Sequence, residues 1–129
     1  MSMTTLEILK KMRALLDKPE NWTRRTYARD VNGEPVSMVN PKDAVSFCIM
    51  GAYRKVSSPV IGQAPIWSGR AVAHYKALQE QIPKPFFSIS DFNHDPHRTL
   101  SAFNDDPSTT HTDMLSLLDR AIISNGQEK

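Results

Sequence analysis

The stretch Thr110–Gly126, THTDMLSLLDRAIISNG, contains the clearest helix in the sequence and sets the fold class. Thr110 and Asp113 have capping-box spacing, in which a threonine hydroxyl and an acidic side chain satisfy the free backbone N–H groups of a helix start. Asn125-Gly126 is a typical C-terminal stop. The apolar residues in between recur at helical spacing: Met114, Leu115, Leu117, Leu118, Ala121 and Ile122. This pattern predicts an amphipathic helix that packs on a core.

Upstream, the same criteria predict further helices. One should run from Thr5 to about Leu16, with Thr4 or Thr5 as its N-cap. Another should open at Ser68 or Gly69 and continue to about Gln81. A short helix is also expected around Arg98 to Phe103.

A central helix is predicted to open at Asn40-Pro41, with Asn40 as cap and Pro41 at the first helical position. Residues 44–53 are apolar on nearly all sides, which favours a buried helix. This places Cys48 in the second turn or later. Gly51 costs about 1 kcal/mol of helix propensity. We expect another helix to approach closely at this residue, which has no side chain, and this contact to compensate for the cost.

Between the first and central helices the pattern favours a β-hairpin. Residues 22–29 are rich in β-preferring types, and Asp30-Val31-Asn32-Gly33 is a turn sequence in which Asn-Gly supplies positive φ angles. Val36, Met38 and Val39 would form the return strand, with Pro35 indicating a short or edge strand. The expected fold is therefore α-rich α+β: about four helices packed with one short hairpin.

The bulk properties fit one domain. The chain has 129 residues, so we expect a single domain with its core at about 5–124 and flexible ends at 1–3 and 126–129. It has no apolar run of the ~18 residues that a membrane helix needs and no signal-peptide pattern. Cys48 is the single cysteine, so an internal disulfide is excluded and a cytoplasmic location is expected.

Charge is unevenly distributed. The net charge of +2 is too small to indicate nucleic-acid binding. Residues 1–84 carry 13 basic and 7 acidic side chains, hence +6, whereas residues 85–129 carry 3 and 7, hence −4. The two halves either pack together and partly neutralise each other, or form a surface with one basic and one acidic side that steers a charged partner.

A short pattern, Phe-Asn-x-Asp-Pro-x-x-Thr, occurs at Phe92–Thr99 and again at Phe103–Thr110. The surrounding segment Asp91–Asp113 holds three of the four histidines and five of the fourteen acidic residues. It is therefore the densest group of potential ligands, acids and bases in the chain.

One hypothesis for this segment is a metal site. His94 and His97, with His111 and nearby carboxylates, are ligand types that zinc prefers. One divalent transition metal would then be the cofactor. The spacing matches no standard zinc signature, and Asp-Pro and Asn-Asp are also ordinary turn and cap residues. We therefore favour a protein without a cofactor.

A second hypothesis is a cysteine nucleophile; with either the metal or the nucleophile the protein would be a small hydrolase. Cys48 with His111 as base and Asn104, Asp105 or Asp113 as orienting group would make a catalytic triad. The thiol would have to lie near a helix N-terminus and be partly exposed. The alternative is a buried structural cysteine, because free cysteines are among the most buried residues.

The favoured hypothesis is binding of a protein partner or of a second copy of the chain. Asp30 or an acidic residue of 105–113 could pair with Arg24, Arg29 or Arg120. Trp67, in a proline-rich loop, is the aromatic residue best placed for contact. The expected binding residues are Trp67, Arg24, Arg25, Asp91, Asp95, Asp105, Asp106 and Asp113.

Four separated motifs carry a resemblance to a known family. They are Trp22-Thr23, Ala28-Arg29-Asp30, Phe47–Ala52 and Phe103–Ile122. Together they resemble a family of small uncharacterised bacterial and phage proteins, catalogued only as a domain of unknown function. The resemblance spans about residues 6–123 and implies a fold unit without an assigned activity. Occurrence in phage implies an accessory or anti-defence role. The upstream repeat copy departs from the family pattern.

Overall fold

The structure is a computed structural model, and it describes residues 4–36, 43–57, 69–83 and 96–126. This part of the chain contains five α-helices, one 3-10 helix and a two-stranded sheet. The elements are α1 (Thr5–Leu15), η1 (Pro19–Asn21), β1 (Ala28–Arg29), β2 (Ser46–Phe47), α2 (Ile49–Ser57), α3 (Gly69–Gln79), α4 (Pro96–Asp105) and α5 (His111–Gly126). The α-rich α+β class is confirmed, with five helices in place of the expected four.

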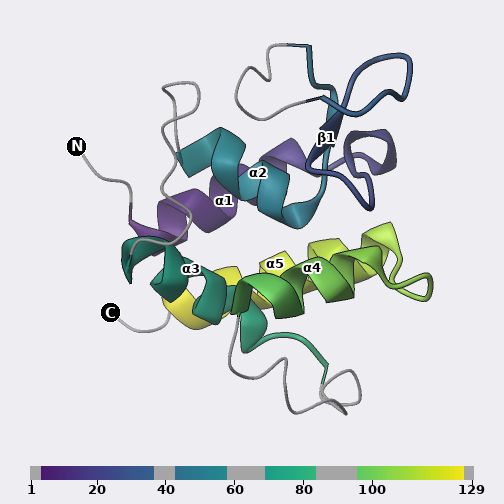
Figure 1. The fold of residues 1–129 in the computed structure, drawn as a ribbon. Coiled ribbons are helices and arrows are strands. Elements are labelled where there is room, and N and C mark those ends of the chain that lie inside the picture. Colours follow the sequence, from purple (N-terminus) through teal and green to yellow (C-terminus); the bar gives the residue numbers. More distant parts are fainter. Residues whose placement is uncertain (1–3, 37–42, 58–68, 84–95, 127–129) are drawn as a thin grey trace.

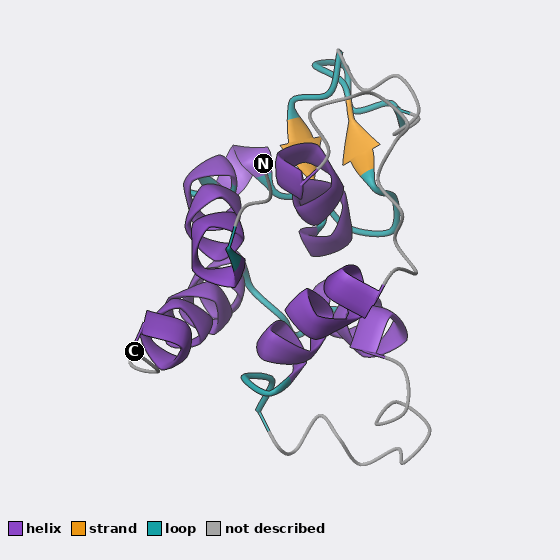
Figure 2. Cartoon of the chain, turned by 90° about the vertical axis from the view of Figure 1, so that its left-hand side faces the viewer, coloured by secondary structure: helices purple, strands orange, loops and turns teal. Residues whose placement is uncertain are grey.

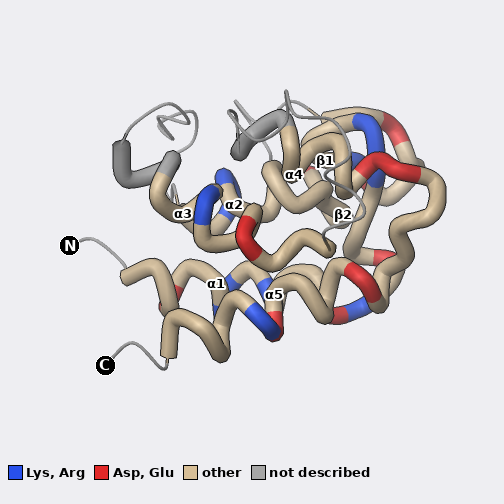
Figure 3. Tube along the Cα trace, turned by 90° about the horizontal axis from the view of Figure 1, so that it is seen from below, with Lys and Arg blue, Asp and Glu red and all other residues tan. Residues whose placement is uncertain are grey.

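The helices pack in pairs around one core. Helices α1 and α5 lie side by side and antiparallel (Figures 1 and 3), and Arg13 on α1 contacts Asp119 on α5 through a 2.8 Å ion pair. Helix α3 packs on α4, and α2 contacts both α1 and α4. Figure 2 shows the small sheet beside α2, at one end of the helical layer. Each of the five α-helices contributes buried apolar side chains to the same cluster.

The predicted capping box of α5 is present, and the predicted N-cap of α1 is Thr4, which also forms a capping box. The backbone N–H of Glu7 donates to Thr4 Oγ1 (3.1 Å), and the N–H of Thr4 donates to Glu7 Oε1 (2.7 Å). At α5 the N–H of Asp113 donates to Thr110 Oγ1 (3.1 Å), and the N–H of Thr110 donates to Asp113 Oδ2 (2.9 Å). These local motifs start the two helices that pack on each other, as the sequence predicts.

The predicted start of the central helix is wrong. Helix α2 begins at Ile49, and residues 43–48 are not helical. The N–H groups of Val45 and Cys48 donate to the carbonyls of Arg29 (2.8 Å) and Tyr27 (3.1 Å). An apolar run of this length suits a buried strand as well as a buried helix. Here the first residues of the run pair with β1, and only the later residues form a helix. Asn40 and Pro41 lie outside the described residues.

The hairpin prediction is right in its turn, and Val36 of the return segment donates to the carbonyl of Ala28 (2.9 Å) as the hairpin requires, but the prediction missed a second partner of β1. Gly33 has a φ of 82°, and the N–H of Asp30 donates to the carbonyl of Glu34 (2.9 Å), so the chain reverses where expected. The returning segment makes one isolated bridge, between Arg29 and Pro35. The strand paired with β1 is β2, antiparallel, with Ala28 opposite Phe47. Met38 and Val39 lie outside the described residues.

Gly51 marks a close approach, although the neighbour is not the helix that was expected. A Cβ at this position would lie 2.0 Å from the carbonyl oxygen of Tyr27. The chain just before β1 therefore crosses α2 in direct backbone contact, and only a residue without a side chain fits there. This crossing brings residues 25–27 to the N-terminal end of α2.

None of the helices in the described ranges is long and apolar enough to cross a bilayer.

Candidate functional site

The site is built around Asn104, a completely buried residue in the last turn of α4. Its Oδ1 accepts hydrogen bonds from the indole Nε1–H of Trp22 (2.7 Å) and from the backbone N–H of Ile49 (3.0 Å). Its Nδ2 donates to the carbonyl of Thr23 (3.1 Å) and to Asp105 Oδ1 (3.0 Å). All four bonding positions of the amide are used. One side chain thus joins α4, the start of α2 and the segment after η1.

Arginine side chains complete the attachment of this segment. Arg24 stacks over the Trp22 ring, with its guanidinium carbon 4.6 Å from the ring centroid, and its Nη2 donates to the carbonyl of Thr109. Arg29 donates to Thr23 Oγ1 (2.7 Å) and to the carbonyl of Arg24 (3.1 Å). Arg29 therefore donates into residues 22–25, and Arg24 attaches this segment to the residues before α5.

The two halves of the chain do meet through polar contacts, but not through the predicted arginine–carboxylate pairs. The ion pairs found among the described residues are those of Arg13 with Asp17 and Asp119. Arg24 uses a backbone carbonyl, and Arg120 donates to the carbonyl of Gln81 (2.7 Å). Carbonyl acceptors replace the expected carboxylates because helix ends and turns leave their carbonyls without intrahelical partners.

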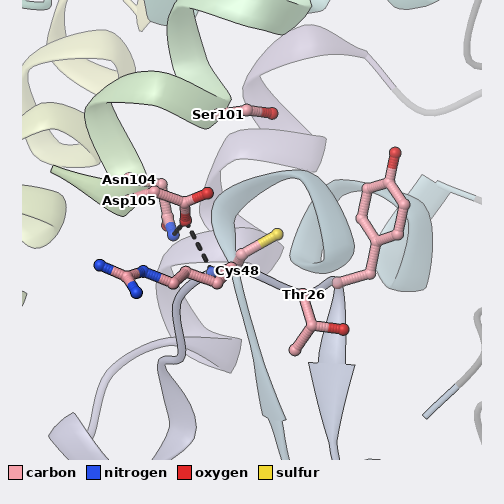
Figure 4. Close-up of a pocket in the computed structure, with 7 residues that line it drawn as sticks. Thr26, Cys48, Ser101, Asn104 and Asp105 are labelled. Atoms are coloured by element: carbon pink, nitrogen blue, oxygen red, sulfur yellow. Dashed lines mark hydrogen bonds between the residues drawn. The ribbon is translucent and has the colours of Figure 1, made fainter. Parts of the chain in front are cut away.

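Asp105 holds Arg25 in an unusual backbone conformation. Arg25 has a φ of 69°, the left-handed region that side-chain-bearing residues rarely adopt. Its backbone N–H donates to Asp105 Oδ1 at 2.8 Å, the bond drawn as a dashed line in Figure 4. The carboxylate therefore fixes the bend that leads the chain from the Asn104 network into β1.

A cavity of about 340 Å³ opens beside this bend, and Figure 4 shows the residues around it. The thiol of Cys48 lies between Ser101 on α4 and Thr26 on the segment before β1. Asn104 and Asp105 lie together at another side. The full lining is Arg25, Thr26, Tyr27, Cys48, Ser101, Asn104 and Asp105. We call this space the Cys48 cavity.

Cys48 is the N-cap residue of α2, because the helix begins at Ile49. Its sulfur accepts the backbone N–H of Gly51 at 3.3 Å. Burial raises the pKa of the thiol to about 11, and the charge of Asp105 adds to this, whereas the N–H groups at the helix start lower it. Burial dominates, so the thiol is protonated at neutral pH. The prediction that placed Cys48 in the second turn or later is wrong, since the residues before it form β2.

This environment predicts slow alkylation. In the native protein at pH 8 we expect Cys48 to react with iodoacetamide at least about 100-fold more slowly than in denaturant, because the thiolate is the reactive form and its pKa is raised to about 11. The native rate should keep rising up to about pH 11, whereas the unfolded rate levels off near pH 9. Mass spectrometry reads the reaction from this single cysteine. Equal rates in both states would contradict the burial.

His111 lies elsewhere, at the start of α5. Its Nε2 contacts the carbonyl of Leu16 at 2.6 Å, where Nε2–H donates, and its ring centroid is 6.2 Å from that of Trp22. His111 is not among the residues that line the Cys48 cavity. The structure thus brings Cys48, Asn104 and Asp105 together, with His111 holding the end of α1 to the start of α5.

The metal hypothesis involves residues that the structure describes only in part. His94 lies outside the described residues, and of His97 only its backbone position in the first turn of α4 is described. Within the described ranges no three His, Cys, Asp or Glu side chains gather as a metal site. The metal and triad assignments both stay predictions.

A second cavity, of about 490 Å³, lies at the junction of α4 and α5. Asp106 Oδ1 accepts both the hydroxyl (2.6 Å) and the backbone N–H (2.8 Å) of Ser108. These two hydrogen bonds lower the pKa of Asp106. We call this space the acidic cavity; its lining is Pro83, Phe103, Asp106, Ser108, Thr109, Asp113, Ser116 and Arg120.

The predicted binding residues therefore separate into groups. Arg25 and Asp105 line the Cys48 cavity, and Asp106 and Asp113 line the acidic cavity. Arg24 instead stacks on the Trp22 ring and donates to the carbonyl of Thr109. Trp67, Asp91 and Asp95 lie outside the described residues.

Sequence reasoning missed three residues of the Cys48 cavity. Ser101 could have been found once α4 was drawn through Asp105, since it lies one helical turn before Asp105 and shares its face. Nothing in the sequence places Thr26 or Tyr27 beside Cys48, because they reach the cavity only through the crossing at Gly51.

The described residues form a small helix-rich domain that is organised by the buried Asn104 amide and contains the Cys48 cavity and the acidic cavity. The chain belongs to the Family of unknown function (DUF6197), whose model matches residues 1–123. No curated protein and no solved structure matches it. The bacterial or phage origin stays a prediction.

Proposed function

We propose that the protein acts by binding another protein and that the acidic cavity is the contact surface. The observation that carries this proposal is an open cavity of about 490 Å³ with two fixed carboxylates, Asp106 and Asp113, in its wall. Ser108 orients the first, and the cap of α5 orients the second. Preformed, oriented charges reduce the ordering that binding requires.

The state of the candidate catalytic groups supports binding over turnover. Cys48 is held as a neutral thiol by burial. The amide of Asn104 has its four positions occupied within the fold. The ring of His111 bonds to a backbone carbonyl. Each of the three groups has a structural role in the described part of the chain.

The chemistry of the cavity indicates a basic partner. The lowered pKa of Asp106 keeps its carboxylate ionised at neutral pH, and Asp113 is exposed. Arg120 lines the same cavity and is engaged with the carbonyl of Gln81. A lysine or arginine of a partner would find acceptors here, and such contacts govern orientation and association rate more than affinity. A cytoplasmic accessory or regulatory role, such as anti-defence, would use this contact.

The test compares two charge-matched double variants as bait for capturing partners from a lysate of the organism that encodes the protein. Asp106→Asn/Asp113→Asn removes two charges and keeps acceptor oxygens for the turn and the cap. Glu20→Gln/Glu34→Gln removes two charges from exposed residues outside the cavity. We expect a captured protein to be retained by wild type and the Glu variant and lost from the Asp variant.

The salt dependence provides a second measurement. The Debye length falls from ~10 Å at 0.1 M salt to ~3 Å at 1 M, so retention should weaken over this range. Sedimentation velocity of the purified protein at both salt concentrations tests a second copy as the partner. Capture that is insensitive both to salt and to the Asp variant would overturn the acidic cavity as the contact surface.

A further inference from the structure

We propose that the Cys48 cavity is a binding site for a free α-amino acid with an uncharged side chain. This inference is independent of the protein-binding proposal, because the lining of the Cys48 cavity shares no residue with that of the acidic cavity. It rests on the charged groups and the neutral polar groups of the cavity lining, and on its volume.

The wall carries one cation and one anion that do not neutralise each other. Asp105 Oδ1 is occupied by the backbone N–H of Arg25 and by Asn104 Nδ2. Neither Asp105 Oδ2 nor the guanidinium of Arg25 has a hydrogen-bond or ion-pair partner among the described residues. A ligand of single charge would meet one group of like charge. A zwitterion matches both, with its carboxylate toward Arg25 and its ammonium toward Asp105.

The rest of the lining suits an uncharged side chain. The hydroxyls of Thr26 and Ser101 have no hydrogen-bond partner among the described residues. The neutral thiol of Cys48 lies between them (Figure 4), and Tyr27 adds an aromatic ring. A cavity of about 340 Å³ has the volume of roughly 11 water molecules, at ~30 Å³ each. That volume fits an amino acid of moderate size.

L-Methionine is the first probe, because its flexible thioether makes favourable contacts with aromatic rings. Two analogues each remove one charge: N-acetyl-L-methionine lacks the ammonium, and L-methioninamide lacks the carboxylate. In isothermal titration calorimetry we expect L-methionine to bind with a Kd of about 1 mM or tighter. Each analogue should bind at least about tenfold more weakly, since each loses one charged hydrogen bond.

Two variants test whether Asp105 binds the ammonium group of the ligand and Arg25 its carboxylate. Asp105→Asn keeps an acceptor at Oδ1 for the Arg25 bend, and Arg25→Gly accepts the positive φ without strain. We expect Asp105→Asn to weaken L-methionine about tenfold and to leave N-acetyl-L-methionine unchanged. Arg25→Gly should weaken L-methionine and leave L-methioninamide unchanged. Glu20→Gln, which changes an exposed charge outside the cavity, should bind L-methionine as wild type does.

Alkylation of Cys48 provides a readout inside the cavity. Saturating L-methionine should slow the native reaction with iodoacetamide several-fold, and equal concentrations of glycerol should not. The proposal is overturned if L-methionine gives neither heat nor protection, or if both analogues bind as well as L-methionine. Asp106→Asn/Asp113→Asn should leave L-methionine binding intact, so failure here and failure of the protein-binding proposal can be distinguished.

Discussion

Replacing Asn104 by alanine should lower the free energy of unfolding by about 4 kcal/mol. The substitution leaves the Trp22 indole N–H, the Ile49 N–H and the Thr23 carbonyl without their partner. Each buried polar group left unsatisfied costs roughly 1–3 kcal/mol. Small domains have only about 5–15 kcal/mol in total, so this one change should remove a large part of the stability. Urea denaturation followed by circular dichroism measures it.

Two further variants make the Asn104 result specific. Asn21→Ala removes a half-buried amide that has no side-chain hydrogen bond among the described residues, and it should cost no more than about 0.5 kcal/mol. Trp22→Phe removes the indole N–H together with the five-membered ring, but it leaves both Ile49 and Thr23 bonded to the amide, so it should cost less than Asn104→Ala. If Asn21→Ala and Asn104→Ala were equally destabilising, the amide would not be the organising contact.

The second large effect is expected from Gly51→Ala. The new Cβ would lie 2.0 Å from the carbonyl oxygen of Tyr27, and the obstructing atom is backbone, so no rotamer change can relieve the clash. Alanine gains about 1 kcal/mol of helix propensity over glycine, but overpacking costs typically 1–3 kcal/mol and sometimes more. We expect a net loss of about 2 kcal/mol or more in the free energy of unfolding. We also expect faster alkylation of Cys48, because its backbone N–H bonds to the same Tyr27 carbonyl.

Gly126→Ala is the matched control for this substitution. A Cβ at Gly126 has no neighbour within 4 Å, and the residue lies at the end of α5. Its stability should be unchanged or slightly higher. If Gly51→Ala behaved like Gly126→Ala, the backbone crossing of α2 would be looser than the structure shows.

Local signals in the sequence were sufficient to predict where the first and last helices begin. Thr4 with Glu7 and Thr110 with Asp113 form capping boxes from residues three apart, so their geometry depends on little else. The helix expected from Ser68 or Gly69 is α3, and the short helix expected around Arg98 to Phe103 lies within α4.

The middle of the chain could not be predicted in the same way. The apolar run 44–53 fits a buried strand or a buried helix equally well, and pairing with Ala28 decides between them. That pairing depends in turn on the crossing at Gly51. Cys48 was therefore placed within a helix that in fact begins one residue after it.

The repeat illustrates the same difficulty. Pro96 of the first copy is the first residue of α4, whereas Pro107 of the second copy lies in the turn before α5. Asn104 of the second copy bonds to Trp22, which is 82 residues away in the sequence. Equal sequence patterns thus have different structures, because the contacts that distinguish them are long-range.

The pairing of α1 with α5 has a consequence for synthesis in the cell. The contact between Arg13 and Asp119 joins residues 106 apart, and His111 bonds to Leu16 across nearly the same interval. Ribosomes add about 5–20 residues per second, so the apolar face of α1 must wait roughly 5–20 s for its partner to be made. Nascent chains should therefore remain dependent on chaperones until α5 has been synthesised, and a stop codon before α5 should yield a product that is degraded.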